Sequence, residues 1–263
     1  MPINTLNDYL AALKQLAIWN KTTTRTTVAA VPFSMFDVAG YPGAGTLAIG
    51  NTANGVVPTD AVAGYPVITN FAGGATGYLS RVTFSNTVAA RVALYDRVFA
   101  AGAYSFNSDI TLASQPSYAG RIPNADYKGL ELWLEAVTAF TGDQSIRIQY
   151  LDQDGNAGDT GVIATGVAPI IGRMYRMPLA AGDTGLQRIN VVTSSVASAG
   201  TFNVMVFRKF WEGRVIAANA GDVHNMLRTG MPRVYEDSAL YGVITADSTS
   251  SGLPSMDIEI ASY

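Results

Sequence analysis

The segment from Asp152 to Asp159 carries the side chains best suited to binding a cation. Closely spaced oxygens are what a hard cation such as Ca²⁺ requires, and here they belong to Asp152, Asp154, Asn156 and Asp159. An EF-hand loop also needs glycine at its sixth position and an acidic residue at its twelfth, where this chain has Ala157 and Ile163. Asp, Gly and Asn are equally typical of a hairpin turn, in which they satisfy local backbone groups. We therefore favour a turn and predict no metal site.

His224 is the only histidine, so a Ser-His-Asp enzyme would depend on it. The surrounding residues, 221–227, are typical of a turn or a helix start, and the chain has no Gly-x-Ser-x-Gly nucleophile elbow. A histidine without a nucleophile is more often a packed or surface residue than a base. We predict that His224 is not catalytic.

Two pairs of carboxylates on predicted strands could serve glycoside hydrolysis, Glu131 with Glu135 and Asp257 with Glu259. Residues two apart on a strand lie ~7 Å apart and residues four apart ~13 Å, whereas glycosidase carboxyl groups lie roughly 5–9.5 Å apart. The first pair is too widely spaced, and only the second could support an enzyme that acts on cell-wall glycan. Solvated strand faces account for both pairs, so we predict no catalytic residue and no enzymatic activity.

Other ligand-binding patterns are incomplete. The glycine-rich segments 43–45 and 73–77 lack the Lys-Ser/Thr ending of a phosphate-binding loop, and no cofactor is predicted. Trp19, Trp133 and Trp211 could stack on sugars, but core or interface packing explains them equally well.

Composition limits the class of protein. Of the 263 residues, 48% are hydrophobic and only 14% charged, below the ~25% usual for a soluble chain, so much of the surface must be small and uncharged or covered by partners. The net charge of -3, with scattered Lys and Arg, argues against binding nucleic acid. No segment approaches the ~20 apolar residues needed to cross a membrane. Because cysteine is absent, disulfides and thiolate metal sites are excluded.

The first residues have the periodicity of a helix. Apolar residues recur at steps of three and four between Leu6 and Trp19, and Thr5 with Asp8 would form a capping box. The threonine-rich tract 20–27 suits an extended connector. We predict that residues 1–27 form an amphipathic helix and a separable arm.

From residue 28 onward, short β-branched and aromatic runs alternate with Gly, Pro, Asn and Asp. This pattern predicts an all-β fold, with residues 28–263 forming a single β-sandwich or jelly roll with long loops at 40–77 and 114–124. The expected strands are 28–38, 78–85, 88–99, 130–139, 145–151, 186–193, 201–210, 240–246 and 256–261.

Two segments resemble virion structural proteins of tailed bacteriophages. Residues 148–160, Ile-Gln-Tyr-Leu-Asp-Gln-Asp-Gly-Asn-Ala-Gly-Asp-Thr, are similar to a strand and loop of those proteins, although Asp159 stands where the pattern has arginine. The ending Met231-Pro232-Arg233-Val234-Tyr235, with Asp237 and the later strand 256–260, is similar to their C-terminal part. The two segments cover under a quarter of the chain. The resemblance implies a multicopy β-rich subunit that packs on a capsid lattice or in a neighbouring layer.

These observations lead to a functional hypothesis. We expect a non-enzymatic head decoration or cement protein that is assembled into a virion in the host cytoplasm. Its expected partners are the major capsid protein or other virion proteins, and copies of itself. A carbohydrate- or receptor-binding module of a tail or fibre is the alternative. If the arm holds the subunit on a shell, the contact residues would be Leu6, Leu10, Leu13 and Trp19.

Overall fold

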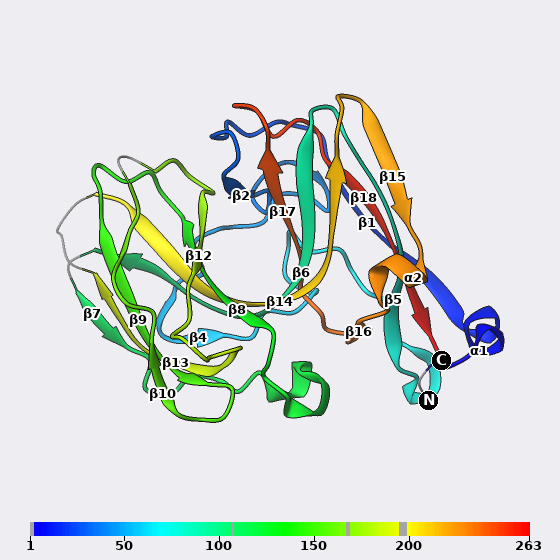
Figure 1. The fold of residues 1–263 in the computed structure, drawn as a ribbon, viewed down its shortest axis with the longest axis horizontal. Helices are drawn as coiled ribbons and strands as arrows, with labels where there is room; N and C mark the ends of the chain where they lie inside the picture. The colour runs from blue at the N-terminus through cyan, green and yellow to red at the C-terminus, as the bar shows by residue number, and fades with distance from the viewer. Residues whose placement is uncertain (1–2, 107, 167–168, 195–198) are drawn as a thin grey trace.

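The computed structural model describes residues 3–106, 108–166, 169–194 and 199–263. Regular structure in this part of the chain is almost entirely β and forms three antiparallel sheets (Figure 1), which confirms the predicted all-β class. The α-helices described are short, α1 (Leu6–Ala11) and α2 (Met226–Thr229). None of the described helices is long and apolar enough to cross a membrane.

The two smaller sheets together contain eleven strands. The six-stranded sheet has the order β15 (Ala220–His224), β5 (Gly77–Asn86), β18 (Ser255–Ser262), β1 (Leu13–Lys21) and β3 (Gly40–Tyr41), with β16 (Arg233–Val234) also paired to β5. The five-stranded sheet has the order β10 (Ala157–Asp159), β9 (Ser145–Asp152), β13 (Leu186–Ser194) and β7 (Asp109–Thr111), with β11 (Ile163–Ala164) paired to β9.

The seven-stranded sheet lies between them and contains the longest strands. Its order is β12 (Met174–Met177), β8 (Leu130–Ala136), β14 (Thr201–Val215), β6 (Ala90–Ser105), β17 (Leu240–Ala246) and β2 (Pro32–Ser34), with β4 (Asn51–Val56) paired to β6. Short 3-10 helices interrupt the connections at η1 (Ala72–Gly74), η2 (Ala119–Arg121) and η3 (Pro123–Ala125).

Both smaller sheets pack on the same face of the seven-stranded sheet. Val92 and Leu94 of β6 belong to a core cluster with the six-stranded sheet, whereas Val98 of the same strand belongs to a cluster with the five-stranded sheet. Alternate residues of a strand point to one face, so these residues and Asp96 share it. Figure 1 shows the two smaller sheets at opposite ends of β6 and β14. Each smaller sheet thus forms a sandwich with the seven-stranded sheet. Asp96 lies between these two sandwiches, at a position that we call the seam.

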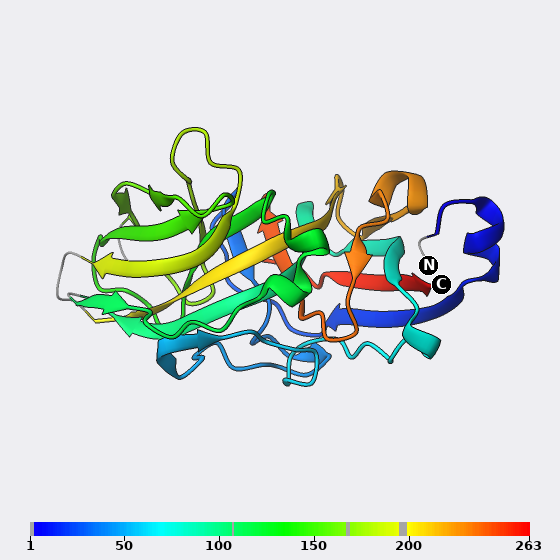
Figure 2. The same cartoon turned by 90° about the horizontal axis from the view of Figure 1, so that it is seen from below.

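The other face of the seven-stranded sheet is covered by residues 35–65, which we call the cover segment. Phe36, Leu47 and Tyr65 of this segment pack in a third core cluster with Phe207 and Tyr241. Figure 2 shows the cover segment, which includes β4, along one side of the molecule. The prediction of a long loop at 40–77 is thus partly wrong, because this region contains short strands and supplies side chains to the core.

The predicted helix over residues 6–19 is wrong beyond its first turns. Thr5 and Asp8 do form the expected capping box, but the chain becomes extended at Ala12, and β1 pairs with β18 from Leu13 to Asn20. An isolated helix of this length gains little stability in water, whereas a strand here gains a hydrogen-bonded partner and buries Trp19. Residues 13–21 are therefore a strand of the six-stranded sheet and not part of a separable arm.

Most of the other predicted strands are confirmed with small changes of boundary. Eight of the nine match β5, β6, β8, β9, β13, β14, β17 and β18. The exception is the expected strand at 28–38, of which only β2 forms. The predicted loop at 114–124 contains η2 and begins η3, and it buries Tyr118, Arg121 and Ile122.

Candidate functional site

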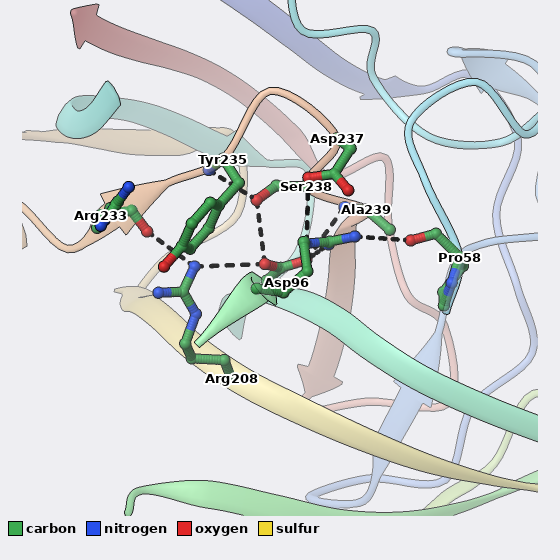
Figure 3. A network of polar contacts seen from close by, with 9 residues as sticks. Pro58, Asp96, Arg208, Arg233, Tyr235, Asp237, Ser238 and Ala239 are labelled. Carbon is green, nitrogen blue, oxygen red and sulfur yellow. Dashed lines mark hydrogen bonds and ion pairs between the residues drawn. The ribbon is translucent and has the colours of Figure 1, made fainter. Parts of the chain in front are cut away.

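The seam is built around the carboxylate of Asp96, which is fully buried on β6. Figure 3 shows the groups that converge on it. Its Oδ1 accepts hydrogen bonds from Nη2 of Arg121 and from the backbone N–H of Ala239, 3.1 Å away. Its Oδ2 accepts from Ser238 Oγ at 3.0 Å and from Arg208 Nη2 at 3.3 Å. Four donors match the roughly four lone pairs of a carboxylate, so Asp96 has no free acceptor for a substrate.

The two arginines extend the seam to distant loops. Arg121, on η2, donates from Nη1 to the Pro58 carbonyl at 2.8 Å in the cover segment, and Arg208, on β14, donates to the Arg233 carbonyl at 2.8 Å. Arg208 also lies over the ring of Tyr235, 5.3 Å from its centroid. The network thus ties the 118–125, 231–239 and cover segments to the central sheet. Its geometry is that of a structural anchor.

A second buried polar cluster lies on the opposite face of the seven-stranded sheet, around Glu135 of β8. Its carboxylate is fully buried and accepts hydrogen bonds from the Tyr241 hydroxyl and from Asn203 Nδ2, the latter at 3.0 Å. The Tyr241 hydroxyl also lies 2.6 Å from Ser34 Oγ. Burial raises the pKa of Glu135 above its ordinary value, because the lost hydration of the charge outweighs the field of Arg97 and the hydrogen bonds that the carboxylate accepts.

This raised pKa predicts a pH dependence of stability. When the folded-state pKa of an acid lies above the unfolded value of 4.5, the folded state binds more protons, and the free energy of unfolding falls as pH rises from 4.5 to the folded pKa. Glu135→Gln is neutral throughout and should lack this loss. Relative to the wild type, the variant should gain about 1.4 kcal/mol for each pH unit crossed in that interval. Urea titrations of both proteins at a series of pH values test this, and parallel stability curves would contradict it.

The predicted interface residues divide into two groups. Leu6, Leu10 and Leu13 are 61%, 66% and 62% exposed, and Leu16 is 51% exposed. Leu6 and Leu10 lie one helical turn apart on α1, and Leu13 and Leu16 follow at the start of β1. We call these four residues the leucine edge. Trp19 was predicted to belong to the same interface, but it is 1% exposed and packs inside this chain, because the strand turns it toward the core.

The segment 152–159 forms a hairpin between β9 and β10, as favoured above. The Asp152 carboxylate accepts hydrogen bonds from the backbone N–H groups of Asp154 and Asn156, both at 2.8 Å. Asp159 instead interacts with Arg147 at 3.5 Å and with the Gly161 N–H at 2.8 Å. Asn156 also donates from Nδ2 to Asp152 Oδ2 at 3.1 Å, so the oxygens of Asp152 and Asp159 are engaged in separate local contacts. Among the described residues, no group of three or more His, Cys, Asp or Glu is placed to hold a metal.

His224 is packed against aromatic rings. Its Nδ1 accepts a hydrogen bond from Trp211 Nε1–H at 2.9 Å, and its Nε2 lies 3.5 Å from Asp222 Oδ2. The ring meets Phe84 edge-on, with centroids 5.1 Å apart. These contacts fix the orientation of the imidazole at the β15 edge of the six-stranded sheet.

Three of the four carboxylates of the two pairs have structural partners, namely Glu131, Glu135 and Glu259. Glu131 accepts from Trp133 Nε1 at 2.9 Å and pairs with Arg176 at 3.1 Å. Glu259 accepts from Ser80 Oγ at 2.7 Å and from the Tyr9 hydroxyl at 3.0 Å. Glu135 lies in the core, so the first pair does not face a common solvent site.

The three tryptophans do not form an exposed sugar-binding platform. Trp19, Trp133 and Trp211 are 1%, 6% and 4% exposed, respectively. Trp133 belongs to a different core cluster from the other two. These three rings are therefore part of the protein core.

Comparison with known proteins adds little to this geometry. No protein-family model and no curated protein matches the chain. A chain in the structure of infectious bursal disease virus, Gx strain, is 10% identical, with 95% of this chain and 80% of that chain covered and a TM-score of 0.20. The Gt strain gives 9% identity, the same coverage and a TM-score of 0.19. Scores this low carry no argument about fold or function.

Proposed function

We propose that this chain is a non-enzymatic structural protein of a tailed-bacteriophage virion that binds the head shell as a decoration protein. The observation that carries the proposal is the leucine edge. Four leucines that are each at least half exposed lie within residues 6–16, and such a concentration of exposed large apolar side chains is a candidate protein interaction site. The low charge content and the resemblance of residues 148–160 and 231–260 to virion proteins support the same proposal.

In this proposal the major capsid protein, or another virion protein, covers the leucine edge, and the subunit acts in many copies. The buried network at Asp96 supports the proposal from inside the subunit, because it holds the 118–125, 231–239 and cover segments in fixed positions. A shell-stabilising protein needs such rigidity, since ordering loops on binding would cost free energy of association.

Substitution of the leucine edge tests the interface. Leu6→Ser, Leu10→Ser and Leu13→Ser together should weaken binding to empty heads by at least about 100-fold, because burying each leucine is worth roughly 1.5–3 kcal/mol. The thermal midpoint should change little, since all three side chains are exposed in the free subunit. Co-sedimentation with empty heads from the same source, across a concentration series, measures the effect. Point substitutions are preferable to truncation, which would remove β1 from its sheet.

A matched control removes apolar groups elsewhere on the surface. Ile216→Ser with Leu227→Ser alters side chains that are 80% and 86% exposed and lie outside the leucine edge. This variant should bind heads like the wild type. Equal binding by the leucine-edge variant would overturn the interface, and a wild-type protein that ignores the heads would overturn the proposed function.

A further inference from the structure

A pocket of about 450 Å³ opens between the cover segment and β6. Its volume falls within the roughly 300–1,000 Å³ typical of small-molecule sites. The wall is mainly apolar, and one charged residue takes part in it. The residues that matter here are Phe36, Ile49, Val56, Val57, Val62 and Arg97.

Arg97 is the unusual member of this lining, because its charge is buried and forms no ion pair with any residue that the structure describes. The residue is 3% exposed. Its guanidinium lies 4.8, 5.2 and 5.0 Å from the ring centroids of Phe36, Tyr65 and Tyr241. Nη1 contacts the sulfur of Met205 at 3.7 Å, and Nε has no hydrogen-bond partner among the described residues.

Three other arginines of the described chain with little exposure each form an ion pair with an aspartate. Arg121 and Arg208 both reach the carboxylate of Asp96, and Arg25 pairs with Asp37. The carboxylate of Glu135 influences Arg97 electrostatically, but its hydrogen bonds are made with Tyr241 and Asn203. Burial of a charge costs several kcal/mol, and here the three aromatic rings and the field of Glu135 offset that cost without placing a carboxylate oxygen on the guanidinium.

We propose that this pocket binds a small aliphatic carboxylate, such as a free medium-chain fatty acid. The carboxylate would accept hydrogen bonds from the guanidinium of Arg97, which presents a planar set of donors suited to a carboxylate. The alkyl chain would lie against the apolar side chains contributed by the cover segment. This site is separate from the leucine edge, so its ligand is independent of the proposed binding to a shell.

Calorimetric titration of the wild-type protein with octanoate and with 1-octanol tests the proposal. The two probes share an alkyl chain and differ in charge. Octanoate should bind at least about tenfold more tightly, because hydrogen bonds to charged groups contribute roughly 1.5–3 kcal/mol. Arg97→Met should abolish this preference and retain binding of 1-octanol. Absence of octanoate binding at millimolar concentration, or equal affinity for both probes, overturns the proposal.

A second pair of variants locates the site without altering the buried charge. Val62 is 50% exposed and lines the pocket, so Val62→Trp should fill the opening without unfolding the protein and weaken octanoate binding at least tenfold. Val67 is 72% exposed and lies outside the lining, so Val67→Trp is the matched control and should bind octanoate normally. Octanoate binding that is unchanged in Val62→Trp would place the ligand elsewhere and overturn this assignment.

Discussion

Asp96→Asn is expected to lower the free energy of unfolding by roughly 3–5 kcal/mol, the usual cost of removing one partner from a buried ion pair. The substitution preserves the shape of the side chain and removes its charge. Arg121 and Arg208, whose side chains are 4% and 12% exposed, would then remain buried beside a neutral group. The amide would also replace one acceptor oxygen with a donor, which would face the donors that now converge on the carboxylate.

Thermal unfolding and urea titration measure this effect. For a chain of this size, 1 kcal/mol corresponds to roughly 2–4 °C in the thermal midpoint, so the midpoint should fall by roughly 6–20 °C. Asp247→Asn is the matched control, because Asp247 pairs with Arg214 at 3.7 Å and both side chains are about half exposed. Exposed pairs contribute less than about 1 kcal/mol. If both variants lose the same small amount, the seam is not an anchor.

The seam could be predicted from the sequence only in part. Val92, Leu94, Asp96 and Val98 share one parity of a predicted strand, and a charged residue in such an apolar series indicates a buried carboxylate that needs a partner. That signal was present at Asp96. The partners could not be predicted, because Arg121 and the 237–239 turn approach through folding of distant loops.

The strands could be predicted because the alternation of apolar and polar residues is a local pattern. The arrangement of the strands into sheets could not be predicted. In β9 buried residues alternate with half-buried ones over all eight residues, whereas β8 is buried on both faces from Leu132 to Ala136, although its sequence alternates. The division into three sheets depends on pairing between remote strands, such as β1 with β18. Residues of the cover segment were also missed, since Leu47 and Tyr65 lie in very short apolar stretches bounded by glycine or proline.

The segment 13–21 shows why local periodicity can mislead. Leu13, Leu16 and Ala17 fit a helical stripe, but Ala17, Trp19 and Lys21 equally fit the alternation of a strand. In the structure Ala17, Trp19 and Lys21 are buried and Leu13 and Leu16 are exposed. Pairing with β18 decides between the two, because it supplies hydrogen bonds that no short-range pattern reveals.

Trp19→Ala is expected to lower the free energy of unfolding by roughly 3–5 kcal/mol, the range for removing a large aromatic side chain from a core. The indole of Trp19 packs directly on the backbone of β17. A Cβ built at Gly242 would lie 2.2 Å from Cζ2 of this ring. Trp19 therefore joins the six-stranded sheet to the seven-stranded sheet, and Gly242 has no side chain to fill the space left by its removal.

This variant also separates a core role for Trp19 from an interface role. Leu16→Ala is the control on the same strand, where the side chain is 51% exposed, and its effect on stability should stay within about 0.5 kcal/mol. Below its own thermal midpoint, Trp19→Ala should still bind empty heads through an intact leucine edge. A Trp19→Ala protein that is as stable as the wild type but fails to bind heads would place this residue in the interface. That result would also refute the packing of Trp19 between β1 and β17.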